Sequence, residues 1–261
     1  IGQTAEICPA DKKMYALRDV TGTVASIPLI CGSIMSKKIA EGIQGLVIDV
    51  KIGNGAFMET LGEGQELARL LQQIGENFHV STDIVFSSMD QPLGRYAGLW
   101  CEVTEVINCL QSEGPEDTMA VTFELGSRLL IQAKTASNKS AAMNLQRELI
   151  ESGRALDKFL EMVTAHGGNR ADIASFQTLH LPAEETVLSA QHSGTISTMN
   201  TKLIGLANSE LGCGRKELDD LLDPTAGMEF YHKIGDQVTE GEPLIRLFNS
   251  NSEKLRAALT M

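Results

Sequence analysis

The sequence of 261 residues is short of basic side chains, with 22 Lys and Arg against 34 Asp and Glu and a formal net charge of −12. A surface of this charge repels polyphosphate backbones, which argues against nucleic-acid binding but leaves room for a small anion in a locally positive pocket. The chain also has no apolar run long enough for a membrane span, and its first residues do not resemble a signal peptide. We therefore expect a cytoplasmic protein with no membrane partner.

Metal and nucleophile signals are equally scarce. The five cysteines are an odd number, widely spaced and without a C-x-x-C pair, which favours small buried thiols in a reducing compartment. The five histidines show no ligand spacing, which argues against a zinc site. A Gly-x-Ser-x-Gly segment is also missing, so nothing indicates a serine hydrolase.

Hydrophobic residues make up 43% of the chain, which is ordinary for a globular protein of one large or two smaller domains. Residues 45–52 form a nearly continuous apolar run, typical of a strand buried on both faces, and a second strand is expected over 79–86. The apolar pattern predicts helices over 60–74, 93–111, 116–134 and 139–165. Strands alternating with helices predict a parallel sheet with covering helices.

The two ends of the chain have a different character. Helices are expected over 11–19 and from Pro28 to about Gly42, preceded by Ile1–Thr4, which resembles the end of a buried strand and suggests a fragment. After about residue 180, short strands (185–189, 194–197, 228–232 and 243–248) surround a helix at 201–211, which predicts an α+β unit.

Four polar side chains near the start could form a binding site. Tyr15 and Arg18 are three residues apart, and Ser33 and Lys37 are four apart, so each pair shares one face of its helix. If the helices form a hairpin, the four groups converge and can grip a flat ring whose edge alternates acceptor and donor, as a pyrimidine does. The alternative is a pair of surface helices with ordinary solvated Arg and Lys, since such spacings are common on exposed faces.

The segment 14–30, MYALRDVTGTVASIPLI, closely resembles the signature of thymidine and pyrimidine-nucleoside phosphorylases. The resemblance continues through SIMSKK (33–38), DVKIGNGAFM (49–58) and MDQPLG (89–94), and reaches LGCGR (211–215) and GDQV (235–238) near the end. It covers nearly the whole chain, and its first block is highly specific.

The resemblance implies a pentosyltransferase that splits uridine or thymidine with inorganic phosphate into free base and (deoxy)ribose 1-phosphate, without an organic cofactor. Arg18, Ser33 and Lys37 would hold the base, with Tyr15 beside them and Phe57 packing near it. Arg18 and Lys37 would stabilise negative charge on the leaving base, which is electrostatic catalysis.

Some family members also bind a monovalent cation, K+, near the phosphate. The matching ligands here are the carbonyls of Leu93 and Tyr96 and the carboxylate of Glu105. Tyr96 replaces a small residue of the family pattern, which a backbone ligand tolerates. The alternative for Glu105 is a solvated helix carboxylate.

The family's phosphate loop, Lys-x-Ser/Thr-x-Gly-Gly followed by Gly-Asp-Lys, has no match in this sequence, and neither has its upstream histidine. We therefore expect the chain taken alone not to turn over. Two rivals stay open: a nucleoside-monophosphate phosphorylase of the same superfamily, and a non-catalytic fragment that binds pyrimidine or dimerises. The residues do not separate uridine from thymidine preference.

Together these observations predict an α/β fold in four parts. Residues 1–8 would end a strand and form a linker, 9–42 would form the helical hairpin of a small α domain, 43–180 a larger, mostly parallel α/β domain, and 181–261 the C-terminal α+β unit. The resemblance further implies domain closure around the substrates and a homodimer formed through the helical domain.

Overall fold

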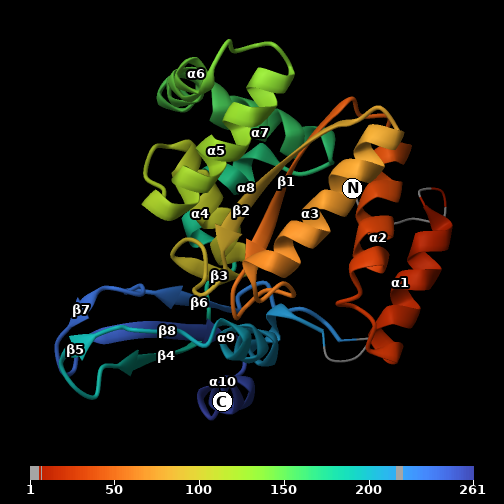
Figure 1. Ribbon diagram of the computed structural model, residues 1–261. Helices are drawn as coiled ribbons and strands as arrows, with labels where there is room; N and C mark the ends of the chain where they lie inside the picture. The colour runs from red at the N-terminus through yellow and green to blue at the C-terminus, as the bar shows by residue number, and fades with distance from the viewer. Residues whose placement is uncertain (1–5, 7, 216–219) are drawn as a thin grey trace. The chain divides into compact units, whose positions relative to one another are not determined.

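The computed structural model describes residues 6, 8–215 and 220–261, so most of the strand end expected at 1–8 lies outside the described residues (Figure 1). The chain divides into two compact units. The first comprises Ile1–Ser88 and Phe123–Met143, and the second comprises Met89–Thr122 and Asn144–Met261. The α/β class is confirmed, and the four-part division at residues 8, 42 and 180 stays a prediction.

The first unit contains three helices and a two-stranded parallel sheet. Its elements are α1 (Pro9–Thr21), α2 (Ile27–Ala40), β1 (Gly45–Ile52), α3 (Leu61–Asn77) and β2 (Ser81–Ser88). The strands pair in register from Gly45↔Ser81 to Ile52↔Ser88, which confirms the parallel arrangement expected from the sequence. α2 lies between α1 and α3 (Figure 1).

The core of the first unit explains why these segments fold together. Met35 of α2 and Leu71 of α3 are almost fully buried and belong to one apolar cluster with Val50 of β1. α3 begins with a capping box, in which the Thr60 hydroxyl accepts from the Glu63 N–H and the Glu63 carboxylate accepts from the Thr60 N–H. The core therefore fixes α2, and with it one side of the α1–α2 hairpin.

The second unit is built around a four-stranded antiparallel sheet of order β3-β6-β8-β4, with a separate pair β5-β7. Its strands are β3 (Tyr96–Gly98), β4 (Glu184–Ser189), β5 (Gly194–Thr195), β6 (Gly227–Phe230), β7 (Gln237–Val238) and β8 (Pro243–Asn249). Its helices are α4 (Trp100–Leu110), α7 (Arg154–Ala165), α8 (Arg170–Ala174), α9 (Thr201–Asn208) and α10 (Ser252–Leu259), with short turns at Phe176–Thr178 and Ser209–Cys213. Two further helices, α5 (Glu116–Gln132) and α6 (Lys139–Glu151), each contribute residues to both units.

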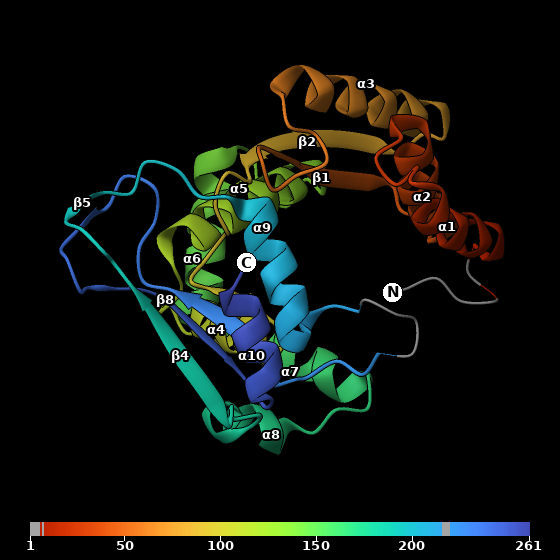
Figure 2. The same ribbon diagram turned by 90° about the horizontal axis from the view of Figure 1, so that it is seen from below.

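The core of the second unit forms where α9 and α10, side by side in Figure 2, pack with the sheet. The large buried side chains of this cluster are Leu211, Met228, Phe230, Leu247 and Leu255. Among the described residues, no helix combines the length and the apolar character that crossing a membrane requires.

Three expected elements differ from the structure. The helix expected from residue 93 begins at Trp100, because residues 96–98 pair with β6 instead. The helix expected over 139–165 is broken into α6 and α7 at Gly153, whose φ of 77° is left-handed. The second strand begins at Ser81 rather than 79, because α3 continues to Asn77. The sequence pattern also does not predict α8, β7 or α10.

Candidate functional site

The α1–α2 hairpin brings one carboxylate, one hydroxyl and one ammonium together. Lys37 Nζ lies 2.8 Å from Asp11 Oδ2 and donates to Ser33 Oγ at 2.9 Å. Ser33 Oγ in turn donates to Asp11 Oδ2 at 3.1 Å. Asp11 and Ser33 are each 5% exposed, so the triangle is closed off from most of the solvent. The predicted meeting of Ser33 and Lys37 thus occurs around a buried carboxylate.

Asp11 is the residue that sequence reasoning missed. It lies four residues before Tyr15 and seven before Arg18, so the three share one face of α1. An acidic residue in the first helical turn also has an ordinary interpretation, because it complements the helix dipole. The i, i+4, i+7 spacing was the available signal, and only the packing of α2 against α1 separates the two interpretations.

Arg18 is buried, with 5% exposure, two turns or about 10 Å along α1 from Asp11. Its Nη2 donates to the carbonyl of Val24 and its Nη1 donates to the carbonyl of Leu29 at 3.4 Å. Its Nε is also buried and has no hydrogen-bond partner among the described residues. A guanidinium has five N–H donors, so the bonds to Val24 and Leu29 in the α1–α2 connection do not use all of them.

Tyr15 lies beside Arg18, whose guanidinium carbon is 5.2 Å from the centre of the Tyr15 ring. That distance is within the range of a cation–π contact. Tyr15 is 41% exposed and Lys37 keeps 21% of its side chain exposed, so the hairpin offers both groups to solvent. The alternative of two surface helices with solvated Arg and Lys is wrong for Arg18, which is buried.

Phe57 lies apart from this polar set in sequence and in setting. It is 65% exposed in the turn that follows β1, between Gly53 and the single bridge formed by Met58 and Ile52. A large exposed apolar side chain at the carboxyl end of a parallel strand is suitably placed for a ligand. Its packing near a base stays a prediction.

The second predicted set of residues surrounds the loop 91–95 and β3. Glu105 of α4 is 8% exposed, and its Oε2 accepts from the backbone N–H groups of Arg95 at 2.7 Å and Tyr96 at 3.0 Å. Its Oε1 accepts a longer bond of 3.4 Å from Thr118 Oγ1. Loss of hydration on burial raises the pKa of the Glu105 carboxyl, and the two backbone N–H groups oppose this shift. The alternative of a solvated helix carboxylate is therefore wrong.

Two of the three ligands predicted for a monovalent cation, the carbonyl of Tyr96 and the carboxylate of Glu105, lie on the same side of β3. Phe230 N–H donates to Arg95 O at 2.8 Å, and Leu99 N–H donates to Ala226 O at 3.4 Å, so Tyr96 between them points its N–H and C=O away from β6. The carbonyl of Tyr96 thus faces the same side as its N–H, which binds Glu105. Leu93, the third predicted ligand, is 38% exposed. Carbonyl and carboxylate oxygens are the donors that hard cations prefer.

A buried carboxylate anchors the other side of Tyr96. Glu229 of β6 is 5% exposed and accepts from Tyr96 Oη at 3.1 Å, while its Oε1 lies 2.7 Å from Arg95 Nη2. Arg246 of β8 forms a second ion pair with Glu229, 2.9 Å long. Burial and the neighbouring Glu229 raise the pKa of Tyr96 to about 12, so its hydroxyl stays protonated and donates. The large residue that replaces the family's small one is thus held by its own partner.

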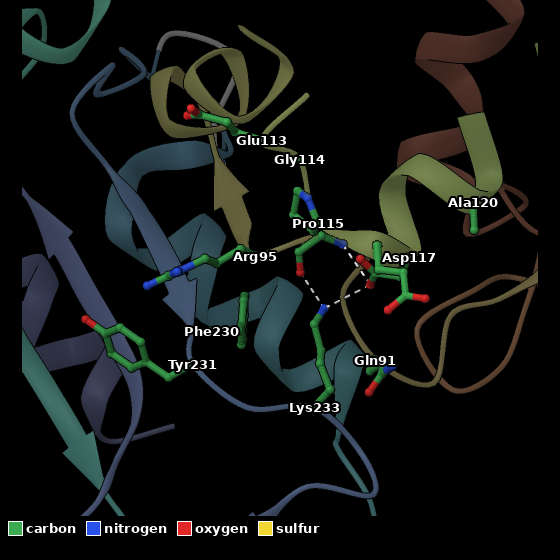
Figure 3. A pocket seen from close by; sticks show the side chains of 12 residues that line it. Gln91, Arg95, Glu113, Gly114, Pro115, Asp117, Ala120, Phe230, Tyr231 and Lys233 are labelled. Carbon is green, nitrogen blue, oxygen red and sulfur yellow. Dashed lines mark hydrogen bonds and ion pairs between the residues drawn. The ribbon is translucent and has the colours of Figure 1, made fainter. Parts of the chain in front are cut away.

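The two predicted sets belong to different units: the hairpin residues to the first, and Leu93, Tyr96 and Glu105 to the second. The second set lines a hollow of about 440 Å³. A separate hollow of about 730 Å³ is lined by other residues of the loop 91–95, the start of α5 and the end of β6 (Figure 3). No sequence signal indicated that hollow.

Comparison with known proteins is consistent with these arrangements. Residues 1–156 match the model of the glycosyl transferase family a/b domain, and residues 195–261 match that of the pyrimidine nucleoside phosphorylase C-terminal domain. The chain is 43% identical over 255 residues to a pyrimidine-nucleoside phosphorylase of Staphylococcus haemolyticus, covering 98% of this chain and 59% of that protein. It is 43% identical over 248 residues to one of Bacillus subtilis, covering 95% of this chain and 57% of that protein. The chain therefore spans less than two thirds of these relatives, and it belongs to the pyrimidine-nucleoside phosphorylase family.

Proposed function

We propose that the protein containing this chain is a pentosyltransferase of nucleoside salvage, which catalyses the reversible phosphorolysis of uridine, thymidine or both. The products are the free base and ribose or deoxyribose 1-phosphate. One observation carries the proposal: the α1–α2 hairpin gathers Ser33 and Lys37 on buried Asp11 and buries Arg18 two turns further along α1, and these are donor types that the edge of a pyrimidine requires. The names of the relatives support the same reaction.

The chemistry follows from the charge that develops on the base. Phosphate displaces the base at the anomeric carbon, and the electrons of the breaking C–N bond pass to the base, whose carbonyl oxygens become more negative. A fixed guanidinium and a fixed ammonium stabilise that charge without reorganising during the reaction, which lowers the barrier more than ground-state binding does. Arg18 is fixed by two backbone carbonyls, and Lys37 is fixed by Asp11 and Ser33.

Asp11 restricts the orientation of the Lys37 ammonium. Two of the three donors of the Lys37 ammonium point to Asp11 and Ser33, so the third is left in a restricted direction. The ion pair keeps the ammonium from swinging into solvent, although Lys37 is only partly buried. Asp11 therefore acts through Lys37 and positions it for the base.

The same family supports three further proposals. A monovalent cation, K+, would bind to the carbonyls of Leu93 and Tyr96 and the carboxylate of Glu105, where it would supply positive charge near the phosphate. The functional protein would be a homodimer in the cytoplasm. Its reactants would be small molecules, a pyrimidine nucleoside and inorganic phosphate, with no nucleic acid or membrane involved.

The test is phosphate-dependent release of uracil and thymine from their nucleosides, with Arg18→Ala as the control. We expect turnover that requires phosphate and is lost in the control. Turnover only with nucleoside monophosphates would indicate the nucleotide phosphorylase instead. Base binding without turnover, in protein as long as the relatives, would refute the proposed reaction and favour a non-catalytic role.

A further inference from the structure

The ammonium of Lys233 is surrounded by oxygens in the way that a small bound cation is. Its Nζ donates to the backbone carbonyls of Pro92 and Gly94, and it lies 3.4 Å from Oδ2 of Asp117. The side chain is 23% exposed, and Figure 3 shows it pointing toward Asp117 at one side of the hollow. The oxygens come from the loop 91–95 and from α5, and the ammonium comes from the turn after β6.

The same turn and the last residue of β6 hold the loop at further points. Ile234 N–H donates to Gln91 Oε1 at 2.7 Å, and Phe230 N–H donates to Arg95 O at 2.8 Å. Gly94 N–H donates to Asp117 Oδ2 at 3.1 Å, so this carboxylate joins the ammonium to the loop. In these contacts, Lys233 supplies the charged group that binds carbonyls of the loop. The two carbonyls belong to Pro92 and Gly94, on either side of Leu93.

Gly94 shows how closely the loop must be placed. Its φ is 73°, and a Cβ at this position would lie 2.0 Å from Glu105 Oε1. The loop therefore passes directly against the carboxylate that we propose as a cation ligand. A small shift of residues 92–94 would change the separation between that carboxylate and the carbonyl of Leu93.

We propose that Lys233 is a positioning residue that serves as a tethered monovalent cation, holding residues 92–94 in the conformation that a K+ site at Leu93, Tyr96 and Glu105 needs. The expected effect on phosphorolysis rests on the proposed function. The expected effect on the order of residues 92–94 does not. Two carbonyls and a carboxylate are a ligand set for hard cations. An ammonium can satisfy the same three oxygens by donating N–H hydrogen bonds to them. Because the ammonium is covalently attached, its local concentration does not depend on the salt in solution.

This arrangement makes a specific prediction for a variant without the charge. Lys233→Met keeps the length of the apolar stem but leaves Pro92 O, Gly94 O and the Asp117 carboxylate without their cation. Three oxygens and one uncompensated negative charge would then attract a cation from solution. The loop should become mobile in a buffer of large organic cations and regain order when K+ is added.

Hydrogen exchange of the backbone amides of residues 93–96, read by mass spectrometry, tests this directly. In choline chloride, we expect Lys233→Met to lower the protection of these amides by at least about tenfold, the effect of losing a hydrogen bond to a charged group. Added K+ should restore protection in the variant and change the unmodified protein by less than twofold. Lys158→Met is the matched control, because Lys158 is an exposed lysine of the same unit paired with Glu161. Unchanged protection of 93–96 in Lys233→Met would overturn the proposal.

A second variant separates the charge from the stem and guards against misfolding of the first. Lys233→Ala leaves space for methylammonium, which can donate hydrogen bonds, whereas tetramethylammonium has the same charge and cannot. Restoration of protection by methylammonium alone supports a hydrogen-bonded cation, and equal restoration by both, or by neither, overturns it. In a phosphorolysis assay, Lys233→Met should raise the K+ concentration for half-maximal activity with little change in KM for uridine. If phosphorolysis itself is absent, the exchange measurements still decide the role of Lys233.

Discussion

Replacing Asp11 by Asn tests whether the buried carboxylate positions Lys37 or merely stabilises the hairpin. The substitution keeps the shape and one acceptor oxygen but removes the charge that faces Lys37 Nζ at 2.8 Å. The side chain of Asp11 is 6% exposed and that of Lys37 is 21% exposed, so the pair is more buried than an ordinary surface ion pair. Its loss should therefore have a measurable effect on both stability and rate.

The magnitude can be bounded from these contacts. Breaking a fully buried pair costs about 3–5 kcal/mol, and a surface pair contributes about 0–1 kcal/mol. Since Lys37 keeps a path to solvent, we expect the free energy of unfolding to fall by about 2 kcal/mol, as for one hydrogen bond to a charged group. The freed ammonium should also leave its place beside the base, which should lower kcat by about tenfold to a hundredfold.

The assay is uracil release from uridine at saturating phosphate, with unfolding in urea measured on the same preparations. Glu41→Gln is the matched control, because Glu41 pairs with Lys38 at 3.3 Å at the C-terminal end of α2, the helix that carries Lys37. We expect that control to change stability by less than about 0.5 kcal/mol and to leave kcat unchanged. A folded Asp11→Asn protein that loses stability but keeps its kcat would show that the carboxylate is structural only, and the reasoning would be refuted.

Three other predictions follow from the contacts above. Arg18→Lys should lower kcat/KM for uridine by about 10²–10³, because a compact ammonium cannot reproduce the planar fork of the guanidinium, which spreads its donors over two backbone carbonyls and the base; an unchanged ratio in the uracil-release assay would contradict this. For Asp223, burial raises the pKa, but hydrogen bonds from Ser250 and Thr225 outweigh it, so the folded pKa lies below 3.8. Its contribution to stability is therefore present above pH 3.8 and is lost as the pH falls below that value; Asp223→Asn should reduce the loss of urea resistance in this range, and equal losses in both proteins would contradict it. Burial raises the pKa of the Cys101 thiol to about 12, so only about 10⁻⁴ of it is thiolate at pH 8; iodoacetamide should label it only after denaturation, as mass spectrometry of its peptide can show.

The secondary structure that depends on local apolar patterns could be predicted from the sequence. The continuous apolar run at 45–52 predicts β1, and the pattern before Gly42 predicts α2, because each depends on side chains close in the chain. The region after residue 93 could not be predicted in this way. Residues 96–98 have a helix-compatible pattern, but pairing with β6, more than a hundred residues later, overrides it.

In the candidate site, the chemistry of the residues could likewise be predicted, but the groups that surround them could not. The chemistry of Arg18 and Lys37 could be inferred from residue type and spacing, with the family resemblance to support it. Their partners could not, since Asp11 and the carbonyl of Leu29 reach them only through the packing of α1 on α2. Likewise, the loop 91–95 contains predicted ligands, but its contact with Lys233 joins positions about 140 residues apart, and no periodicity in the sequence reports such a contact.

The hydrogen bonds of Glu105 to the backbone also bear on aggregation, because one of them covers an N–H group of an edge strand. β3 ends the order β3-β6-β8-β4 and is therefore an edge strand, whose outward N–H groups could pair with a strand of another molecule. Glu105 occupies the outward N–H of Tyr96, so the edge offers one donor fewer and a buried carboxylate in its place. A substitution such as Glu105→Ala would thus remove the proposed cation ligand and expose the edge at the same time. Loss of activity in that variant should be interpreted only alongside its state of association.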